Sequence, residues 1–303
     1  MTTFVLVLIG PADGSGPVPE AAREIVSSAG SATWREPRWL SPGEASELAF
    51  EAPDEATARA IRDVAAVRWQ EAPIDVCVVP AEGRRKGLLV ADMDSTIIQQ
   101  ECIDEMADML GLKPRIAAIT ERAMRGELPF EAALTERLAL LGGLAEGDLQ
   151  RVFDERVTLM PGARTLIATM RAAGAFTALV SGGFGFFTSR VAAAVGFDVD
   201  RANTLEVVGG RLTGRVVGPI LGREAKLAAL EHYRAERGLP AAATMAVGDG
   251  ANDLAMIKAA GLGVAYRAKP VVAAEAHAGI SHGDLTALLY LQGYARAEFV
   301  GRG

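Results

Sequence analysis

The stretch Gly87-Leu88-Leu89-Val90-Ala91-Asp92-Met93-Asp94-Ser95-Thr96 decides how the rest of the chain is interpreted. An apolar run that follows a glycine is typical of a strand buried on both faces of a parallel sheet. Asp92 and Asp94 then stand at the carboxyl end of this strand, where open α/β sheets bind their ligands. Carboxylates in this position can act as nucleophiles or transfer protons, whereas in other contexts a D-x-D pattern suits a solvated turn or a capped helix start.

The composition is that of an acidic globular protein. Its 303 residues, 50% of them hydrophobic, suffice for one large domain and one small domain. A net charge of −7 without a long basic run argues against nucleic acid and membranes as partners. Cys77 and Cys102 lack metal-ligand spacing, so we expect buried thiols in a reducing cytoplasm. The apolar run 4–9 is too short to span a membrane and is expected to be the first strand.

Residues 1–82 are expected to form a small α+β domain. Strand and helix signals follow one another in the order β-α-β-β-α-β, which is the ferredoxin-like pattern. The expected strands lie near 4–9, 32–40, 47–51 and 74–79, and the expected helices near 19–29 and 54–67. The segment 80–87 is polar and basic, so we interpret it as a linker that holds the first domain only loosely. From this we expect the first domain to be dispensable for chemistry.

Residues 83–303 are expected to form a Rossmann-like parallel sheet, because strand and helix signals alternate. The expected strands after Asp92 lie near 176–180, 205–208, 211–217, 244–247 and 263–266. Between about residues 98 and 158 only helices are expected, near 101–110, 114–125, 130–141 and 146–156. Since this insert directly follows the Asp92 loop, we expect a helical cap over a bound ligand; an ordinary helical subdomain is the alternative.

Three of the expected strands end in polar, glycine-rich loops. These loops carry Asp92 and Asp94, then Ser181 and Gly182, then Asp249, Asn252 and Asp253. In a parallel sheet all three lie along one edge, and Lys226 begins a helix that can reach the same edge. Carboxylates that hold Mg²⁺, with N–H groups and an ammonium that hold phosphate, are what phosphoryl transfer needs.

These motifs resemble the haloacid dehalogenase superfamily of phosphatases that form an aspartyl-phosphate. The shared pattern is a D-x-D-x-T loop, a strand that ends in serine, a distant lysine and a GDxxxD loop. It matches Asp92, Asp94, Thr96, Ser181, Lys226, Asp249 and Asp253, and the resemblance spans about residues 85–300. Within the superfamily, the segments 92–96, 180–184 and 247–253, together with the cap residues Glu101, Met124, Phe130 and Arg137, resemble the phosphoserine phosphatases. Residues 1–82 resemble amino-acid-sensing ACT modules.

The resemblance implies a role for each of these positions. Asp92 would be the nucleophile and Asp94 the general acid and base, with Mg²⁺ held by Asp92, Asp249 and the carbonyl of Asp94. Ser181, Gly182, Lys226 and Asn252 would bind the phosphate, Glu101 the substrate ammonium and Arg137 its carboxylate. Met124 and Phe130 would close the site, and Asp253 would lie beside Asp249 without contacting the metal directly. The implied activity is the hydrolysis of O-phospho-L-serine, the last step of serine biosynthesis.

Several alternatives stay open at this point. Glu101 also suits a helix N-terminus, Arg137 also suits a surface pair with Glu101 or Glu136, and Asp253 also suits a helix cap. Met124 and Phe130 have the spacing of ordinary core residues. The enzyme alternatives are another small-phosphomonoester phosphatase or a phosphotransferase. A different class is a regulatory protein that responds to amino acids through residues 1–82, and the oligomeric state, a homodimer included, is open.

Overall fold

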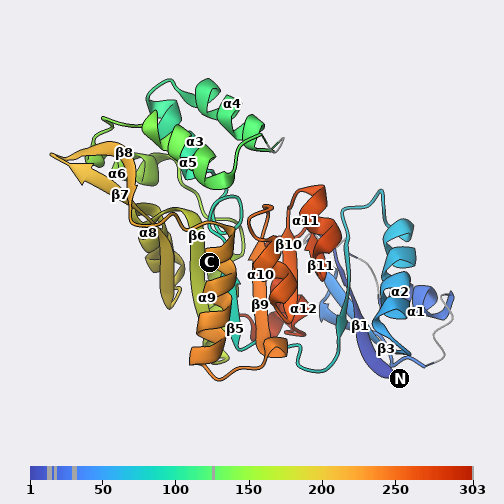
Figure 1. Ribbon diagram of the computed structural model, residues 1–303. Helices are drawn as coiled ribbons and strands as arrows, with labels where there is room; N and C mark the ends of the chain where they lie inside the picture. Colours follow the sequence, from blue (N-terminus) through green and yellow to red (C-terminus); the bar gives the residue numbers. More distant parts are fainter. Residues whose placement is uncertain (12–15, 17–18, 29–32, 125–126, 302–303) are drawn as a thin grey trace.

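The computed structural model describes residues 1–11, 16, 19–28, 33–124 and 127–301, and it contains two main β-sheets (Figure 1). The first sheet is antiparallel with the strand order β2-β3-β1-β4, and it carries two helices. Its elements are β1 (Thr2–Ile9), α1 (Pro19–Ser28), β2 (Arg38–Ser41), β3 (Ala45–Ala52), α2 (Glu55–Arg68) and β4 (Asp75–Pro80). The element order and the antiparallel pairing agree with the ferredoxin-like fold expected from the sequence.

The second sheet has the strand order β11-β10-β9-β5-β6-β7-β8 and is parallel except for the pair β7 and β8. Its strands are β5 (Leu88–Ala91), β6 (Phe176–Phe184), β7 (Val199–Val208), β8 (Arg211–Val217), β9 (Thr244–Gly248), β10 (Leu262–Tyr266) and β11 (Ala278–Ile280). Because β5 lies between β6 and β9, the carboxyl ends of these three strands are neighbours. The α/β fold predicted from the sequence is therefore confirmed.

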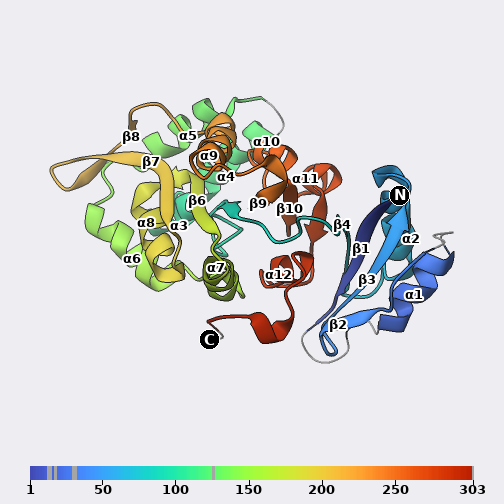
Figure 2. The same ribbon diagram turned by 90° about the horizontal axis from the view of Figure 1, so that it is seen from below.

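Helices cover both faces of the parallel sheet (Figure 2). One face packs against α7 (Ala163–Ala172), α8 (Gly185–Val195) and α12 (Ala287–Leu291), and the other against α9 (Arg223–Glu236), α10 (Leu254–Ala259) and α11 (Pro270–Glu275). In β5, Leu89 and Ala91 belong to the first core, whereas Leu88 and Val90 belong to the second. Burial on both faces explains why this strand is apolar at every position.

Four helices form the cap that the sequence predicted: α3 (Cys102–Met109), α4 (Lys113–Met124), α5 (Phe130–Ala139) and α6 (Glu146–Arg156). They lie above the parallel sheet in Figure 1. The two linkers of the cap pair with each other through a bridge between Ile98 and Leu159. The hairpin β7–β8 contacts the cap from the side, where Gly143 donates its N–H to the carbonyl of Leu212 at 2.8 Å.

The N-terminal sheet is firmly attached to the core, contrary to the loose linkage expected from the sequence. In β1, Phe4 and Leu6 face α1 and α2, whereas Val5 and Val7 on the opposite face belong to the same hydrophobic cluster as α12. The expectation was wrong because it considered only the polar linker and not the second face of the sheet. The domain boundary near residue 82 stays a prediction, since the hydrophobic core runs across it.

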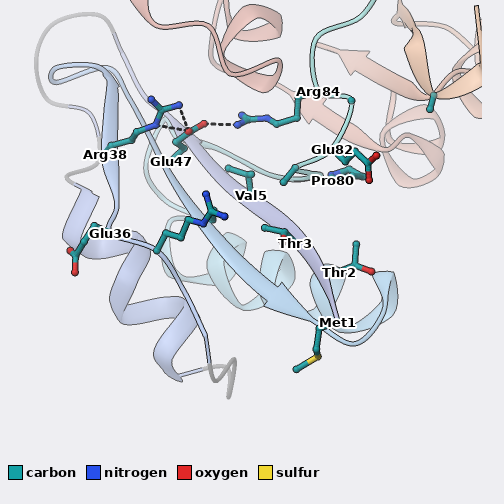
Figure 3. Close-up of a pocket in the computed structure, with 15 residues that line it drawn as sticks. Met1, Thr2, Thr3, Val5, Glu36, Arg38, Glu47, Pro80, Glu82 and Arg84 are labelled. Atoms are coloured by element: carbon teal, nitrogen blue, oxygen red, sulfur yellow. Dashed lines mark hydrogen bonds and ion pairs between the residues drawn. The ribbon is translucent and has the colours of Figure 1, made fainter.

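A cavity of about 1040 Å³ is lined mainly by residues of the N-terminal sheet and of the segment 80–84 that connects this sheet to the core (Figure 3). Its wall includes Glu47, which is buried and pairs with Arg84 at 2.8 Å and with Arg38 at 2.8 Å. None of the residues that line this cavity belongs to the loops after β5, β6 or β9. The loops that carry the candidate catalytic residues therefore lie elsewhere.

Short elements escaped the sequence analysis. Helices α10 and α11 and strand β11 have only six, six and three residues, too few to produce a periodic pattern. β6 was expected to end at Val180 but continues to Phe184, with its pairing to β7 interrupted between these two residues. Among the described residues, no helix has the length and apolar character that crossing a bilayer requires.

Candidate active site

Asp92 lies at the centre of the candidate site, directly after β5. Its backbone N–H continues the pairing with β9 by donating to the carbonyl of Val247 at 3.0 Å. The residue is only 5% exposed, and the Oδ1 atom accepts the N–H of Met93 at 2.8 Å. The strand thus fixes both the backbone and the carboxylate of Asp92.

Lys226 on α9 holds this carboxylate. The Nζ atom lies 2.6 Å from Oδ1 of Asp92 and 2.6 Å from Oδ1 of Asp253, and Lys226 is 1% exposed. Burial alone would lower the pKa of Lys226, but attraction by Asp253 and Asp92 outweighs it, so the pKa lies above its ordinary value. Lys226 is therefore a fixed positive charge beside Asp92.

Asp253 was expected beside Asp249 without direct contact to the metal, and that role stays a prediction. In the structure Asp253 is fully buried, has a carboxylate oxygen within 4.8 Å of one of Asp249, and pairs with Lys226. Its Oδ2 atom accepts the N–H of Gly250 at 3.0 Å, and a side chain at Gly248 would collide with it. Burial and repulsion by Asp92 raise the pKa of Asp253 to about 7. Asp253 thus orients Lys226 and shapes the loop after β9.

The acidic side chains at this edge form a group suited to a metal ion. Carboxylate oxygens of Asp92, Asp249 and Asp253 lie within 4.8 Å of one another. Asp253 pairs with Lys226 at 2.6 Å, while Asp249 accepts a long hydrogen bond, 3.5 Å, from the hydroxyl of Thr96. Burial and repulsion by Asp92 raise the pKa of Asp249 to about 6. Two close carboxylates on a partly buried edge fit a hard divalent cation that prefers oxygen ligands.

Asp94 is placed for proton transfer. Its Oδ1 accepts the N–H of Cys102 at 2.9 Å, and its Oδ2 accepts the hydroxyl of Ser181 at 3.3 Å. Gly183 passes so close that a Cβ there would lie 2.8 Å from Oδ2 of Asp94. Desolvation, with repulsion by Asp92, raises the pKa of Asp94 to about 6, although the Cys102 N–H acts in the opposite direction. A carboxyl group with this pKa can both give and take a proton near neutral pH.

The cap reaches the carboxyl end of β6 through Phe130. A Cβ at Gly182 would lie 3.1 Å from Cζ of Phe130, and one at Gly222 would lie 3.3 Å from its Cδ1. Ser181 is buried and bonds to the N–H of Gly183 at 2.8 Å, while Asn252 is half-buried in the loop after β9. The structure thus brings the predicted phosphate-binding residues and Phe130 to one edge of the sheet. Met124 ends α4, but its side chain lies outside the described part of the structure.

Glu101, directly before α3, and Arg137, on α5, are close enough to interact electrostatically. Ser95, whose φ is 55°, donates its hydroxyl to Oε1 of Glu101 at 2.8 Å. Glu101 is exposed, yet the protein atoms around it reduce the hydration of its carboxyl, and together with repulsion by Asp94 this raises its pKa to about 8. Partial burial lowers the pKa of Arg137, against the attraction of Glu101. Its Nη1 bonds to the hydroxyl of Thr120 at 3.4 Å.

Of the simpler alternatives, a surface pair between Arg137 and Glu136 finds no support in the described contacts, whereas Glu101 does lie at the N-terminus of α3. Glu136, the other acid considered as a partner of Arg137, instead pairs with Arg122 at 3.1 Å. Glu101 precedes α3 as its N-cap residue but makes no capping hydrogen bond with its side chain. Sequence reasoning missed Ser95 and Thr120 as supports of this pair. Ser95 lies inside the motif and its hydroxyl was a usable signal, whereas nothing in the sequence singles out Thr120.

Comparison with known proteins agrees with this geometry. The family model for haloacid dehalogenase-like hydrolases matches residues 89–258. The chain belongs to the haloacid dehalogenase-like hydrolase family. Within the family it is 47% identical over 227 residues to a phosphoserine phosphatase of Streptomyces coelicolor, covering 74% of this chain and 55% of that protein. It is 46% identical to the phosphoserine phosphatase of Idiomarina loihiensis, covering 67% of this chain and 92% of that protein.

A solved haloacid dehalogenase family hydrolase from Salmonella enterica serovar Typhi is similar over almost the whole chain. It has a TM-score of 0.81 and 31% identity, and the match covers 95% of this chain and 98% of that one. The match includes the N-terminal sheet as well as the haloacid dehalogenase-like core. The chain spans about half the length of the Streptomyces relative.

Proposed function

We propose that this protein hydrolyses O-phospho-L-serine to L-serine and phosphate, the last step of serine biosynthesis in the cytoplasm. The observation that carries the proposal is the arrangement around Asp92. A carboxylate held by Lys226 lies beside a proton-transfer group, Asp94, and below a cap that offers one acid and one base. Glu101 and Arg137 match the ammonium and the carboxylate of an amino acid, and Lys226 matches its phosphate.

In the first step Asp92 attacks phosphorus. A bond forms between its carboxylate oxygen and phosphorus as the bond from phosphorus to the serine oxygen breaks, and protonated Asp94 gives its proton to that oxygen. In the second step Asp94 takes a proton from water, whose oxygen displaces Asp92 from phosphorus. Ser181, Gly182, Lys226 and Asn252 would contact the phosphate oxygens through both steps, where fixed donors stabilise developing charge.

Mg²⁺ is the cofactor that we propose for this reaction. The carboxylates of Asp92 and Asp249 and the backbone carbonyl of Asp94 would hold it. When bound, it supplies positive charge that lets an anionic nucleophile approach an anionic phosphate. Burial, together with repulsion by Asp92, raises the pKa of Asp249, and the positive charge of a bound cation would oppose both effects.

The cap would select the substrate. Arg137 offers a planar pair of donors to a carboxylate, and Thr120 holds one of its nitrogens. Glu101, held by Ser95, offers a carboxylate to an ammonium. Phe130 and Met124 would complete the wall of the site.

A panel of phosphomonoesters assayed with Mg²⁺ tests the proposal. We expect the highest kcat/KM for O-phospho-L-serine, with p-nitrophenyl phosphate turned over less efficiently. Faster turnover of a sugar phosphate would support a different phosphatase. Transfer of the phosphoryl group to an added alcohol in preference to water would support a phosphotransferase.

A further inference from the structure

A buried carboxylate of the N-terminal sheet binds a loop of the catalytic core. Asp75 is the first residue of β4 and is 4% exposed. Its two oxygens accept hydrogen bonds from three consecutive backbone N–H groups, those of Ser281, His282 and Gly283, at 2.7 to 3.2 Å. Loss of these donors would leave a buried carboxylate without hydrogen bonds, which costs free energy. Asp75 and the segment 281–286, called the 281–286 loop below, are therefore fixed together.

The 281–286 loop in turn contacts the second linker of the cap. Leu285 donates its N–H to the carbonyl of Pro161 at 3.0 Å. Gly162 has a φ of 82°, and a Cβ there would lie 2.7 Å from the nitrogen of Thr286 and 2.9 Å from Oδ1 of Asp284. Because the two segments are in such close contact, the linker cannot shift without moving the loop.

The same linker is bonded to the segment that carries the nucleophile. Met160 donates its N–H to the carbonyl of Ile97 at 2.8 Å, and Gln99 donates to the carbonyl of Thr158 at 3.0 Å. Ile97 in turn donates to the carbonyl of Met93, which lies between Asp92 and Asp94, at 2.9 Å. A continuous set of contacts therefore runs from Asp75 to the catalytic loop.

Arg267 adds a second contact between these elements. It is one of two described non-glycine residues with positive φ, at 46°, a conformation that costs free energy. Its N–H bonds to the carbonyl of Ile280 at 2.7 Å, directly before the 281–286 loop, and its guanidinium bonds to the sulfur of Met160 at 3.8 Å. Arg267 thus connects the end of β11 to the cap linker, because its backbone bonds to Ile280 and its side chain bonds to Met160.

We propose that Asp75 is a positioning residue for the reaction at Asp92. By fixing the 281–286 loop it holds the cap linker 158–162 where the cap closes over the nucleophile with Glu101 and Arg137 in place. The N-terminal sheet thereby acts on catalysis without touching the substrate. The kinetic part of this inference rests on the proposed function, whereas the mechanical part rests on the contacts alone.

Hydrogen exchange measured by mass spectrometry on the full chain tests the mechanical part. Asp75→Ala removes all acceptors, and Asp75→Asn keeps one oxygen but turns a donor toward the N–H groups. Glu47→Gln is the matched control, since Glu47 is an equally buried interface carboxylate whose partners lie outside the 281–286 loop. In both Asp75 variants we expect exchange at 281–286 and at 158–162 to accelerate by roughly tenfold or more. In Glu47→Gln we expect the exchange rates of both segments to stay as in the wild-type protein.

Steady-state kinetics test the consequence of these contacts for catalysis. We expect both Asp75 variants to lower kcat/KM for phosphoserine by roughly tenfold, and for p-nitrophenyl phosphate by less, because p-nitrophenyl phosphate has no ammonium or carboxylate that Glu101 and Arg137 of the closed cap must meet. Faster exchange confined to 281–286, with the linker and kcat/KM unchanged, would overturn the inference, as would equal effects in Glu47→Gln. If Asp75→Ala does not fold, Asp75→Asn decides. If wild-type protein hydrolyses no phosphomonoester, the proposed function fails while the exchange result still decides the mechanical link.

Discussion

Lys226 lies 2.6 Å from Asp92, and both side chains are almost fully buried. This pair joins the helix α9 to the end of β5 and places a fixed positive charge beside the proposed nucleophile. Because a third group, Asp253, shares the same ammonium, the removal of any member leaves a buried charge without its partner.

Lys226→Gln should therefore lose stability as well as activity. We expect the free energy of unfolding to fall by about 3–5 kcal/mol, the usual cost of breaking a buried ion pair on one side. Urea unfolding followed by circular dichroism measures it. Lys258→Gln is the control, because Lys258 pairs with Glu275 at 2.7 Å on the surface, where such pairs contribute about 0–1 kcal/mol. Equal losses in both variants would contradict the importance given to burial.

Asp92→Asn and Asp94→Asn should fail in different ways. An amide is a poor nucleophile, so Asp92→Asn should form no phosphoenzyme, whereas Asp94→Asn should slow both proton transfers by about 10²–10⁴-fold. Intact-mass analysis after rapid quench separates the two. A phosphoryl adduct on the Asp92→Asn protein would show that another residue is the nucleophile.

Activity should depend on Mg²⁺. We expect dialysis against a chelator to abolish turnover and added Mg²⁺ to restore it, while Ca²⁺ should bind but support little turnover because its larger, looser shell misplaces the attacking oxygen. Asp249→Asn should raise the Mg²⁺ concentration needed for half-maximal rate far more than Asp253→Asn, whose carboxylate holds Lys226. Full activity in excess chelator would contradict the proposed cofactor.

Arg137→Ala should change substrate preference. We expect kcat/KM for phosphoserine to fall by a factor that corresponds to about 2–5 kcal/mol, because the substrate carboxylate loses its partner. For p-nitrophenyl phosphate, which has no carboxylate, the change in kcat/KM should be small. Glu101→Gln should likewise lower kcat/KM for phosphoserine more than for p-nitrophenyl phosphate, because the substrate ammonium loses its partner. Arg122→Ala, which removes an exposed pair with Glu136 on the same cap, is the control. Losses of equal size on both substrates would show that Arg137 and Glu101 have structural roles and do not bind the substrate.

A chain that starts at Arg84 should fold poorly. The sequence suggested that residues 1–82 could be removed, but Val5 and Val7 share a hydrophobic cluster with α12, and Arg84 bonds to Glu47. Removal would expose this apolar surface to water, at about 25 cal/mol per Å². Soluble yield and thermal unfolding measure the effect. A truncated protein with the stability and kcat of the full chain would show that the sheet is merely attached.

The sequence by itself determined where the chemistry gathers. A buried parallel strand has a local signature, an apolar run after glycine, and its carboxyl end is where ligands bind. The loops at Asp92, Ser181 and Asp249 could therefore be assigned to one edge of the sheet from the residues alone. The family resemblance then supplied roles for the cap residues Glu101 and Arg137, which periodicity alone would have left as surface charges.

Only the tertiary structure decided which groups meet. The sequence did not show that Asp253 would pair with Lys226, 27 positions away, or that Thr120 of a different helix would bond to Arg137. The docking of the N-terminal sheet through Asp75 also left no trace in the sequence. The physical reason is that a local pattern reports burial and strand ends, whereas a contact between distant segments depends on how complete elements pack against one another.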